Sequence, residues 1–163
     1  MTKVVCLDTH ILIWGVEQTA RNTQQDMIER TIQFIDSLPA QKIKPIIPSV
    51  VLSEFLMPIP YEKKGLYLDS INQKLKVVPY DTIAAIEFVN IWQSKQDEKI
   101  IKKLREQGIS KNHLKIDCMI VATAITRRAS CIYSHDKGLK NFAVGHIDVK
   151  EIPELPSQQK ITF

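Results

Sequence analysis

Residues 4–14 read VVCLDTHILIW, a short run of β-branched and apolar side chains followed by Asp8 and then a second apolar stretch. The run 4–7 predicts a buried strand that ends at Asp8. The stretch 11–14 indicates the opening turn of a helix. The chain therefore starts with a strand that leads directly into a helix.

The same alternation of strand and helix continues along the chain. Further strands are expected at residues 43–47, 75–80, 131–134 and 146–152. Further helices are expected at residues 22–38, 50–57, 66–74, 81–100 with a break near Ser94, and 114–128. Five strands separated by helices predict an α/β fold with a mainly parallel five-stranded sheet flanked by helices. Ligands of such sheets usually bind beyond the carboxyl ends of the strands.

Length and composition indicate one ordinary globular domain. The chain has 163 residues, of which 44% are hydrophobic and 25% charged, and this balance excludes a disordered or low-complexity protein. We assign residues 1–152 to the domain and 153–163 to a C-terminal tail. The sequence shows neither a signal-peptide pattern nor a membrane-span pattern, and its three cysteines are an odd number in apolar surroundings. We therefore expect a cytoplasmic protein, with no membrane, whose thiols are reduced and buried.

Positive charge is concentrated in one segment. The net charge is +4, yet residues 95–128 alone carry +5 and the remainder carries −1. Such a segment favours contact with a polyanion, and we predict phosphate contacts for Lys111 and Lys115 because they flank Asp117 in the sequence. The alternative is a solvated helix face on which Asp97 and Glu98 pair with Lys102.

Two acidic residues in the first half of the chain have a physical reason to be functional. Asp8 follows the first strand directly and lies at its carboxyl end, although an aspartate there is also a preferred helix cap. Glu54 has Val50 four residues and Val51 three residues before it, so on a helix its carboxylate lies on an apolar face. A raised pKa, a metal ion or a salt bridge to a lysine would each reduce the cost of burying that charge.

Two further acids occur in the second half. Asp117 is the one charge in the apolar stretch 116–125, where we place it in the first turn of a buried helix. The helix dipole contributes about 0.3–1 kcal/mol there, which does not offset the loss of water, so a nearby cation is expected. Asp136 follows the strand 131–134, either as a turn residue or as part of a site.

All four carboxylates can meet at one edge of the predicted sheet. Carboxylates brought together repel one another, so Asp8, Glu54, Asp117 and Asp136 make sense as a group only around a multivalent cation. An all-oxygen site suits Mg²⁺ or Mn²⁺, and such ions promote hydrolysis of phosphodiester bonds. The four are therefore predicted as metal ligands and catalytic residues.

The residues around these acids resemble the PIN-domain ribonuclease family, and more closely its VapC-type toxin branch. Four segments carry the likeness, namely LDTHILIW at 7–14, VVLSEF at 50–55, KIDCMIVATA at 115–124 and SHD at 134–136. The resemblance implies a metal-dependent endoribonuclease with Asp8 and Asp117 as the surest metal ligands. It also implies that Glu54 holds metal and positions water and that Asp136 completes the cluster.

The resemblance extends to substrate and partners. Thr9 and Ser134 would orient a carboxylate, a water or a phosphate, and they are predicted as substrate-binding residues together with Lys111 and Lys115. A toxin of this branch implies a cognate antitoxin protein and a homodimer. The proline-bracketed apolar stretch 48–60 would line a groove for a partner helix, unless it is ordinary core. The insertions 21–38 and 94–113 make the chain longer than many members of the branch.

Two other functions stay open at this stage. A nonenzymatic RNA-binding or protein-interaction module would keep the fold without cleaving RNA. A phosphohydrolase with an aspartyl nucleophile is disfavoured, because no acid stands two positions after Asp8. For His10, His113 and His135 we favour substrate contact or packing in turns over acid–base chemistry.

Overall fold

A parallel five-stranded sheet forms the centre of the computed structural model, which describes residues 1–154. Its strand order is β3-β2-β1-β4-β5, and every neighbouring pair is parallel. The strands are β1 (Lys3–Leu7), β2 (Ile43–Pro48), β3 (Lys76–Val78), β4 (Ile132–Tyr133) and β5 (Val149–Lys150). The predicted α/β fold with a five-stranded sheet is confirmed. Nearly all of the predicted tail 153–163 lies outside the described residues.

The central strand explains why the apolar run at the start of the chain is so continuous. β1 lies between β2 and β4, and Val5, Cys6 and Leu7 have no exposed surface. A parallel strand covered on both faces needs apolar side chains on both sides, so its sequence does not alternate. All three cysteines are buried and free, as predicted.

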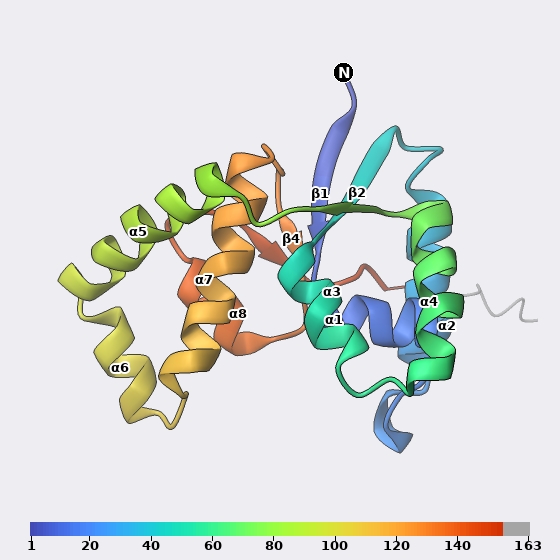
Figure 1. Cartoon of the computed structure of the whole chain (residues 1–163), viewed down its shortest axis with the longest axis horizontal. Helices are drawn as coiled ribbons and strands as arrows, with labels where there is room; N and C mark the ends of the chain where they lie inside the picture. Colours follow the sequence, from blue (N-terminus) through green and yellow to red (C-terminus); the bar gives the residue numbers. More distant parts are fainter. Residues whose placement is uncertain (155–163) are drawn as a thin grey trace, which may run out of the picture.

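Helices cover both sides of the sheet (Figure 1). α2 and α4 lie on one side of β1 and β2 in that view, and α5, α6 and α7 lie on the other. The helical elements are α1 (Thr9–Leu12), the π-helix η1 (Ile13–Glu17), the 3₁₀ turn η2 (Asn22–Gln24), α2 (Asp26–Ser37), α3 (Ser49–Leu56), α4 (Tyr61–Lys74), α5 (Thr82–Asp97), α6 (Ile100–Glu106), α7 (Lys111–Thr126) and α8 (Lys137–Ala143). Within residues 1–154, no helix combines the length and apolarity that a membrane span requires.

Two helix starts differ from the prediction because of side-chain caps. The Ser110 hydroxyl accepts a hydrogen bond from the backbone N–H of His113 at 3.1 Å, so α7 begins at Lys111 and not at Leu114. The sequence predicts no helix after Asp136, a candidate turn residue. The chain continues there into α8, because Asp136 accepts hydrogen bonds from the first backbone N–H groups of that helix.

Other boundaries shifted by several residues. The break predicted near Ser94 lies instead at Lys99, whose backbone is left-handed (φ +59°) and separates α5 from α6. The helix predicted from residue 66 starts at Tyr61, directly after Pro60, because proline is well tolerated just before a first turn. The last strand is two residues long instead of the predicted seven (146–152). The predicted helix 22–38 begins with η2, and α2 follows from residue 26.

Candidate active site

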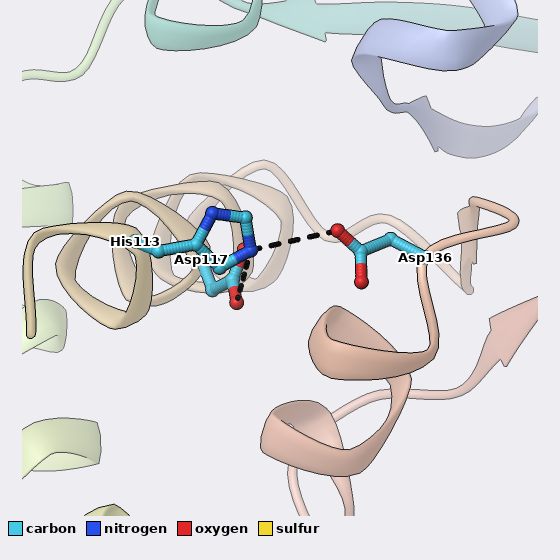
Figure 2. A group of neighbouring side chains, drawn as sticks. All are labelled: His113, Asp117 and Asp136. Atoms are coloured by element: carbon cyan, nitrogen blue, oxygen red, sulfur yellow. Dashed lines mark ion pairs between the residues drawn. The ribbon is translucent and has the colours of Figure 1, made fainter. Parts of the chain in front are cut away.

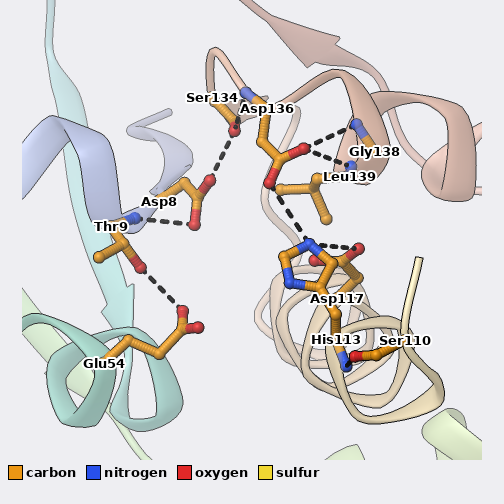
Figure 3. A network of polar contacts seen from close by, with 10 residues as sticks. All are labelled: Asp8, Thr9, Glu54, Ser110, His113, Asp117, Ser134, Asp136, Gly138 and Leu139. Atoms are coloured by element: carbon orange, nitrogen blue, oxygen red, sulfur yellow. Dashed lines mark hydrogen bonds and ion pairs between the residues drawn. The ribbon is translucent and has the colours of Figure 1, made fainter. Parts of the chain in front are cut away.

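The four predicted carboxylates come together at one edge of the sheet. Asp8 follows β1 and Asp136 follows the neighbouring strand β4, while Glu54 lies on α3 and Asp117 on α7. Helices α1 and α7 both pack against α3, which brings the four elements together. Figure 3 shows Asp8 and Glu54 entering the shared space from one side, and Asp117 and Asp136 from the other.

Asp8 is buried and held in a fixed orientation. Its residue is 5% exposed, Oδ1 accepts the backbone N–H of Thr9 at 2.7 Å, and Oδ2 accepts the hydroxyl of Ser134 at 2.6 Å. Burial raises the pKa of this carboxyl, although the two hydrogen bonds oppose the rise. Asp8 is thus both the N-cap of α1 and a member of the acidic cluster, so the two roles considered from the sequence occur together.

Glu54 is tied to the same edge by a neighbouring hydroxyl. Oγ1 of Thr9 donates to Oε2 of Glu54 at 2.9 Å, so adjacent residues of one turn hold two of the carboxylates. The glutamate is half-buried, and the loss of water raises its pKa. No lysine lies in an ion pair with it among residues 1–154, contrary to the salt-bridge alternative.

Asp117 is the least compensated of the four. It is the seventh residue of α7 and therefore lies in the second turn of that helix, not in the predicted first turn. Its residue is 3% exposed, and its Oδ2 is buried without a hydrogen-bond partner. Burial, reinforced by the other three carboxylates and opposed by His113, raises the pKa of Asp117 to about 7.

Asp136 divides its two oxygens between structure and site. Oδ1 accepts the backbone N–H groups of Gly138 at 2.6 Å and Leu139 at 3.2 Å, and so caps α8. Oδ2 faces α7, 3.5 Å from Nε2 of His113. The hydroxyl of Ser134 also accepts the backbone N–H of Asp136 at 3.0 Å, so this serine links Asp136 to Asp8.

The sequence favours substrate contact or packing in a turn for His113 and does not place this residue in the acidic cluster. Its side chain stands between Asp117 and Asp136 (Figure 2), in the first turn of α7 and one turn before Asp117. The spacing of four residues is a signal for a shared helix face, but the predicted helix began after His113. Neither distance from Nε2 to the two carboxylates, 3.6 and 3.5 Å, is that of a hydrogen bond.

The other two histidines near the site both contact Trp14. Nε2 of His135 accepts the backbone N–H of Ile152 at 3.1 Å, and the ring meets Trp14 edge-on with centroids 5.1 Å apart. The ring of His10 lies 5.4 Å from the same tryptophan. Trp14 is buried, as expected for a core residue.

The chemistry of the cluster suits a divalent cation. Four carboxylates share the space, and in the described part of the chain no lysine or arginine forms an ion pair with any of them. The buried Oδ2 of Asp117 has no donor to satisfy it, and all the acidic donors are hard oxygen ligands. The residues present therefore fit a Mg²⁺ or Mn²⁺ ion of the kind expected from the sequence.

Fewer basic residues of the segment 95–128 lie on an open surface than its net charge suggests. Lys95 is buried and Arg127 pairs with Asp81 at 2.6 Å, so neither belongs to an open basic face. The exposed members are Lys99, Lys102, Lys103, Arg105, Lys111, Lys115 and Arg128. The alternative pairing of Lys102 is wrong, because Asp97 accepts from Gln93 and Glu98 accepts from Ser94.

The fold and the acidic edge define a class of α/β domains with a carboxylate cluster beyond the ends of the parallel strands, and a sequence comparison names the family. A family model described as PIN domain matches residues 5–145, which is most of the chain. This protein belongs to the PIN domain family. The resemblance inferred from the four sequence segments is confirmed at this level.

Solved structures with the same fold come from bacterial VapBC proteins. The chain is similar to VapBC2 from Rickettsia felis, solved bound to a DNA fragment from its promoter, with a TM-score of 0.62, 15% identity, and coverage of 91% of this chain and 98% of that one. DNA-bound VapBC from Salmonella typhimurium gives 0.57 at 20% identity, with 94% and 100% covered. VapBC-1 from nontypeable Haemophilus influenzae gives 0.56 at 14% identity, with 91% and 97% covered. No curated protein matches the sequence.

Proposed function

We propose that this PIN domain is a metal-dependent endoribonuclease that hydrolyses RNA phosphodiester bonds and serves as the toxin of a VapC-type toxin–antitoxin pair in the cytoplasm. One observation carries the nuclease proposal. Asp117 is buried with a carboxylate oxygen that has no hydrogen-bond partner, among three further carboxylates. A protein that used these acids only for stability would supply them with donors from its own chain, because a buried unpaired charge costs several kcal/mol.

Asp8 and Asp117 would hold a Mg²⁺ or Mn²⁺ ion, with Glu54 and Asp136 completing the ligand set. Both aspartates are almost fully buried, so they are the two carboxylates that gain most from a cation. Such an ion, when bound, lowers the pKa of a coordinated water and neutralises charge on the scissile phosphate.

The protein's own hydroxyl groups orient the acids. Ser134 donates to the carboxylate of Asp8 and accepts the backbone N–H of Asp136, so one side chain orients the Asp8 carboxylate and holds the backbone that carries Asp136. Thr9 likewise orients the carboxylate of Glu54 on α3. The hydroxyl hydrogens of both residues are engaged with carboxylates, which supports the orienting role over direct phosphate contact among the roles predicted for them.

RNA is the proposed polymer, and the exposed cations on α6 and α7 are its proposed phosphate contacts. Lys111 and Lys115 lie on the first two turns of α7, the helix that carries Asp117, and both are exposed. An exposed lysine beside an acidic metal site attracts the phosphate backbone without competing for the ion.

An antitoxin partner is supported by apolar side chains near the α3–α4 junction. Met57, Tyr61 and Leu66 are 76%, 88% and 69% exposed, and Met57 lies one turn after Glu54 at the end of α3. Large apolar side chains that gather on a surface mark protein interaction sites. An antitoxin segment that covers them would lie beside the acidic cluster and restrain it.

A homodimer is supported by a second apolar strip, on α5. Ile83, Ile86 and Val89 follow one another at three-residue spacing and are 61–62% exposed. The dimer is testable by light scattering of the purified chain. Ile86→Lys should convert a dimer to a monomer, and an unchanged mass for this variant would exclude α5 as the interface.

The central test is RNA cleavage with matched variants. The purified chain should shorten a mixed pool of cellular RNA with Mg²⁺ or Mn²⁺ and not with EDTA, and the new RNA ends map the cleavage sites. Asp8→Asn and Asp117→Asn should each lower cleavage by at least about 100-fold with an unchanged CD spectrum. Asp69→Asn, at an exposed position on α4, is the control and should retain full activity.

Two results would count against the proposal. Full cleavage by either site variant would remove the catalytic role of the acids. RNA binding that survives EDTA without cleavage under any divalent ion would instead identify a nonenzymatic RNA-binding module.

A further inference from the structure

His113 offers a nitrogen atom to the acidic cluster. Its Nε2 lies 3.6 Å from Oδ2 of Asp117 and 3.5 Å from Oδ2 of Asp136. One ligand atom from each of the three residues lies within 4.8 Å of the other two. Figure 2 shows one ring nitrogen of His113 directed at both acids. The group combines one imidazole with two carboxylates, which is a recognised type of ligand set for metal ions.

The separations fit a shared ion better than direct hydrogen bonds. N–H···O hydrogen bonds span about 2.7–3.2 Å, and Nε2 lies beyond that range from both carboxylates. Two ligand atoms that each stand about 2.0–2.2 Å from one ion are about 2.9–4.3 Å apart, depending on the angle between them. The buried Oδ2 of Asp117, which faces Nε2, has no hydrogen-bond partner.

The fold places this imidazole by two local devices. The Ser110 hydroxyl caps α7 through the backbone N–H of His113, which puts His113 in the first turn, four residues before Asp117 and on the same helix face. Oδ1 of Asp136 caps α8, so Oδ2 is the oxygen that faces the ring of His113. Ser110 Oγ and Asp136 Oδ1 thus serve as helix caps, while Nε2 of His113 and Oδ2 of Asp136 remain available to an ion.

We propose that Nε2 of His113 is a ligand of the ion at this site, together with Asp117 and Asp136, and that it shifts the preference of the site from Mg²⁺ to Mn²⁺. The inference rests on the metal site of the proposed function and specifies its ion. Mg²⁺ favours an all-oxygen shell, whereas imidazole suits first-row transition ions. Mn²⁺ is the transition ion that the carboxylate-rich remainder of the site also accommodates.

The test measures metal binding without RNA. Mn²⁺ binding to the purified full chain is followed by the loss of the free-ion EPR signal, and Mg²⁺ binding by calorimetry. Wild type should bind Mn²⁺ at least tenfold more tightly than Mg²⁺. His113→Gln should weaken Mn²⁺ binding at least tenfold and Mg²⁺ binding less than threefold.

A spectroscopic signature separates ligation from a merely nearby charge. Bound Mn²⁺ in wild type should show electron spin-echo modulation from a directly coordinated ¹⁴N nucleus, and His113→Gln should lose it. The matched control is His146→Gln, between α8 and β5 and outside the cluster, which should keep both the modulation and the affinity. CD spectra and thermal unfolding of each variant establish that it is folded.

Each failure has its own meaning. Absence of nitrogen modulation in wild type, or an equal loss of Mn²⁺ and Mg²⁺ affinity in His113→Gln, overturns the inference about His113. Asp117→Asn gives the separate reading on the site itself. If Asp117→Asn binds both ions as wild type does, the metal site of the proposed function fails as well. If Asp117→Asn loses metal binding and His113→Gln does not, the metal site is supported, but His113 is not one of its ligands.

Discussion

Two buried charged side chains in this domain, Lys95 on α5 and Asp117 on α7, differ in how the protein compensates their charge. Lys95 is 2% exposed, and its Nζ donates at 2.6 Å to the backbone carbonyl of Val144, which caps the C-terminus of α8. Asp117 is 3% exposed, and its Oδ2 has no hydrogen-bond partner. The lysine thus lies at the negative end of a helix dipole, whereas the aspartate lies among other negative charges.

The difference teaches how to separate a structural charge from a functional one. A structural charge is satisfied within the chain, so the folded state does not depend on a ligand. A charge left unsatisfied next to like charges destabilises the ligand-free protein and is stabilised when a cation binds. The variants below test that distinction, from the largest expected effect to the smallest.

Without metal, the free energy of unfolding should fall with rising pH because the buried carboxyl of Asp117 ionises. Its pKa rises from 3.8 to about 7 on folding, so the folded state holds more protons than the unfolded state between these pH values. The contribution is fully present below about pH 4 and is lost as the pH rises through 7, a decrease on the order of 4 kcal/mol. Urea unfolding in EDTA from pH 4 to pH 8 measures it.

The raised pKa values of Asp8 and Glu54 act in the same direction. Asp117→Asn should remove most of the decrease, and saturating Mn²⁺ or Mg²⁺ should flatten it in wild type. An equally steep decrease in Asp117→Asn would show that the burial of this carboxylate costs nothing.

Lys95→Ala should show the opposite behaviour, a loss of stability that does not depend on metal. The variant loses a hydrogen bond from a charged donor and leaves a cavity where the buried side chain packed, together about 2–4 kcal/mol. Chemical unfolding with and without Mn²⁺ measures it. Lys102→Ala, at an exposed position on α6, is the control and should stay within about 0.5 kcal/mol of wild type. If the stability lost in Lys95→Ala depended on metal, Lys95 would not be a purely structural charge.

Ser134→Ala should affect both stability and metal binding. It removes the donor to Asp8 and the acceptor for the backbone N–H of Asp136, which costs about 1–3 kcal/mol of unfolding free energy. Because the Asp8 carboxylate loses its donor and the backbone at Asp136 loses its acceptor, metal affinity should fall about tenfold. Ser53→Ala removes an exposed hydroxyl that bonds only to its own helix and should change neither quantity. Wild-type metal affinity in Ser134→Ala would refute the orienting role.

Charges on the open surface of α7 should have the smallest effect. Lys111→Gln and Lys115→Gln should each weaken RNA binding a few-fold and reduce the slope of log K against log salt by about 0.7, with no change in stability. Fluorescence anisotropy with a labelled RNA in EDTA at several salt concentrations measures the slope. The control is Lys3→Gln, at the amino end of β1 and thus at the opposite edge of the sheet. A slope as steep as wild type in both α7 variants would remove these lysines from the RNA contact surface.

The strand-and-helix order was predictable because it depends on local pattern. The apolar run before Asp8 requires a strand covered on both faces, and the apolar stretch around Asp117 requires a buried helix, whatever the neighbours are. Strand-end positions then indicate which acids share an edge of the sheet. Element boundaries were less accurate, because they depend on single side chains such as Ser110 and Asp136 that cap helices.

By itself, the sequence determined the α/β class, the family resemblance and the four acids, since hydrophobic periodicity and strand-end position are properties of neighbouring residues. Only the tertiary structure decided which hydroxyl holds which carboxylate, since Ser134 and Asp8 are 126 residues apart. It also decided that Lys95 is satisfied by the end of α8, and that His113 stands between two acids from different elements. Such contacts form between elements distant in the chain, and their geometry is set by the packing of those elements.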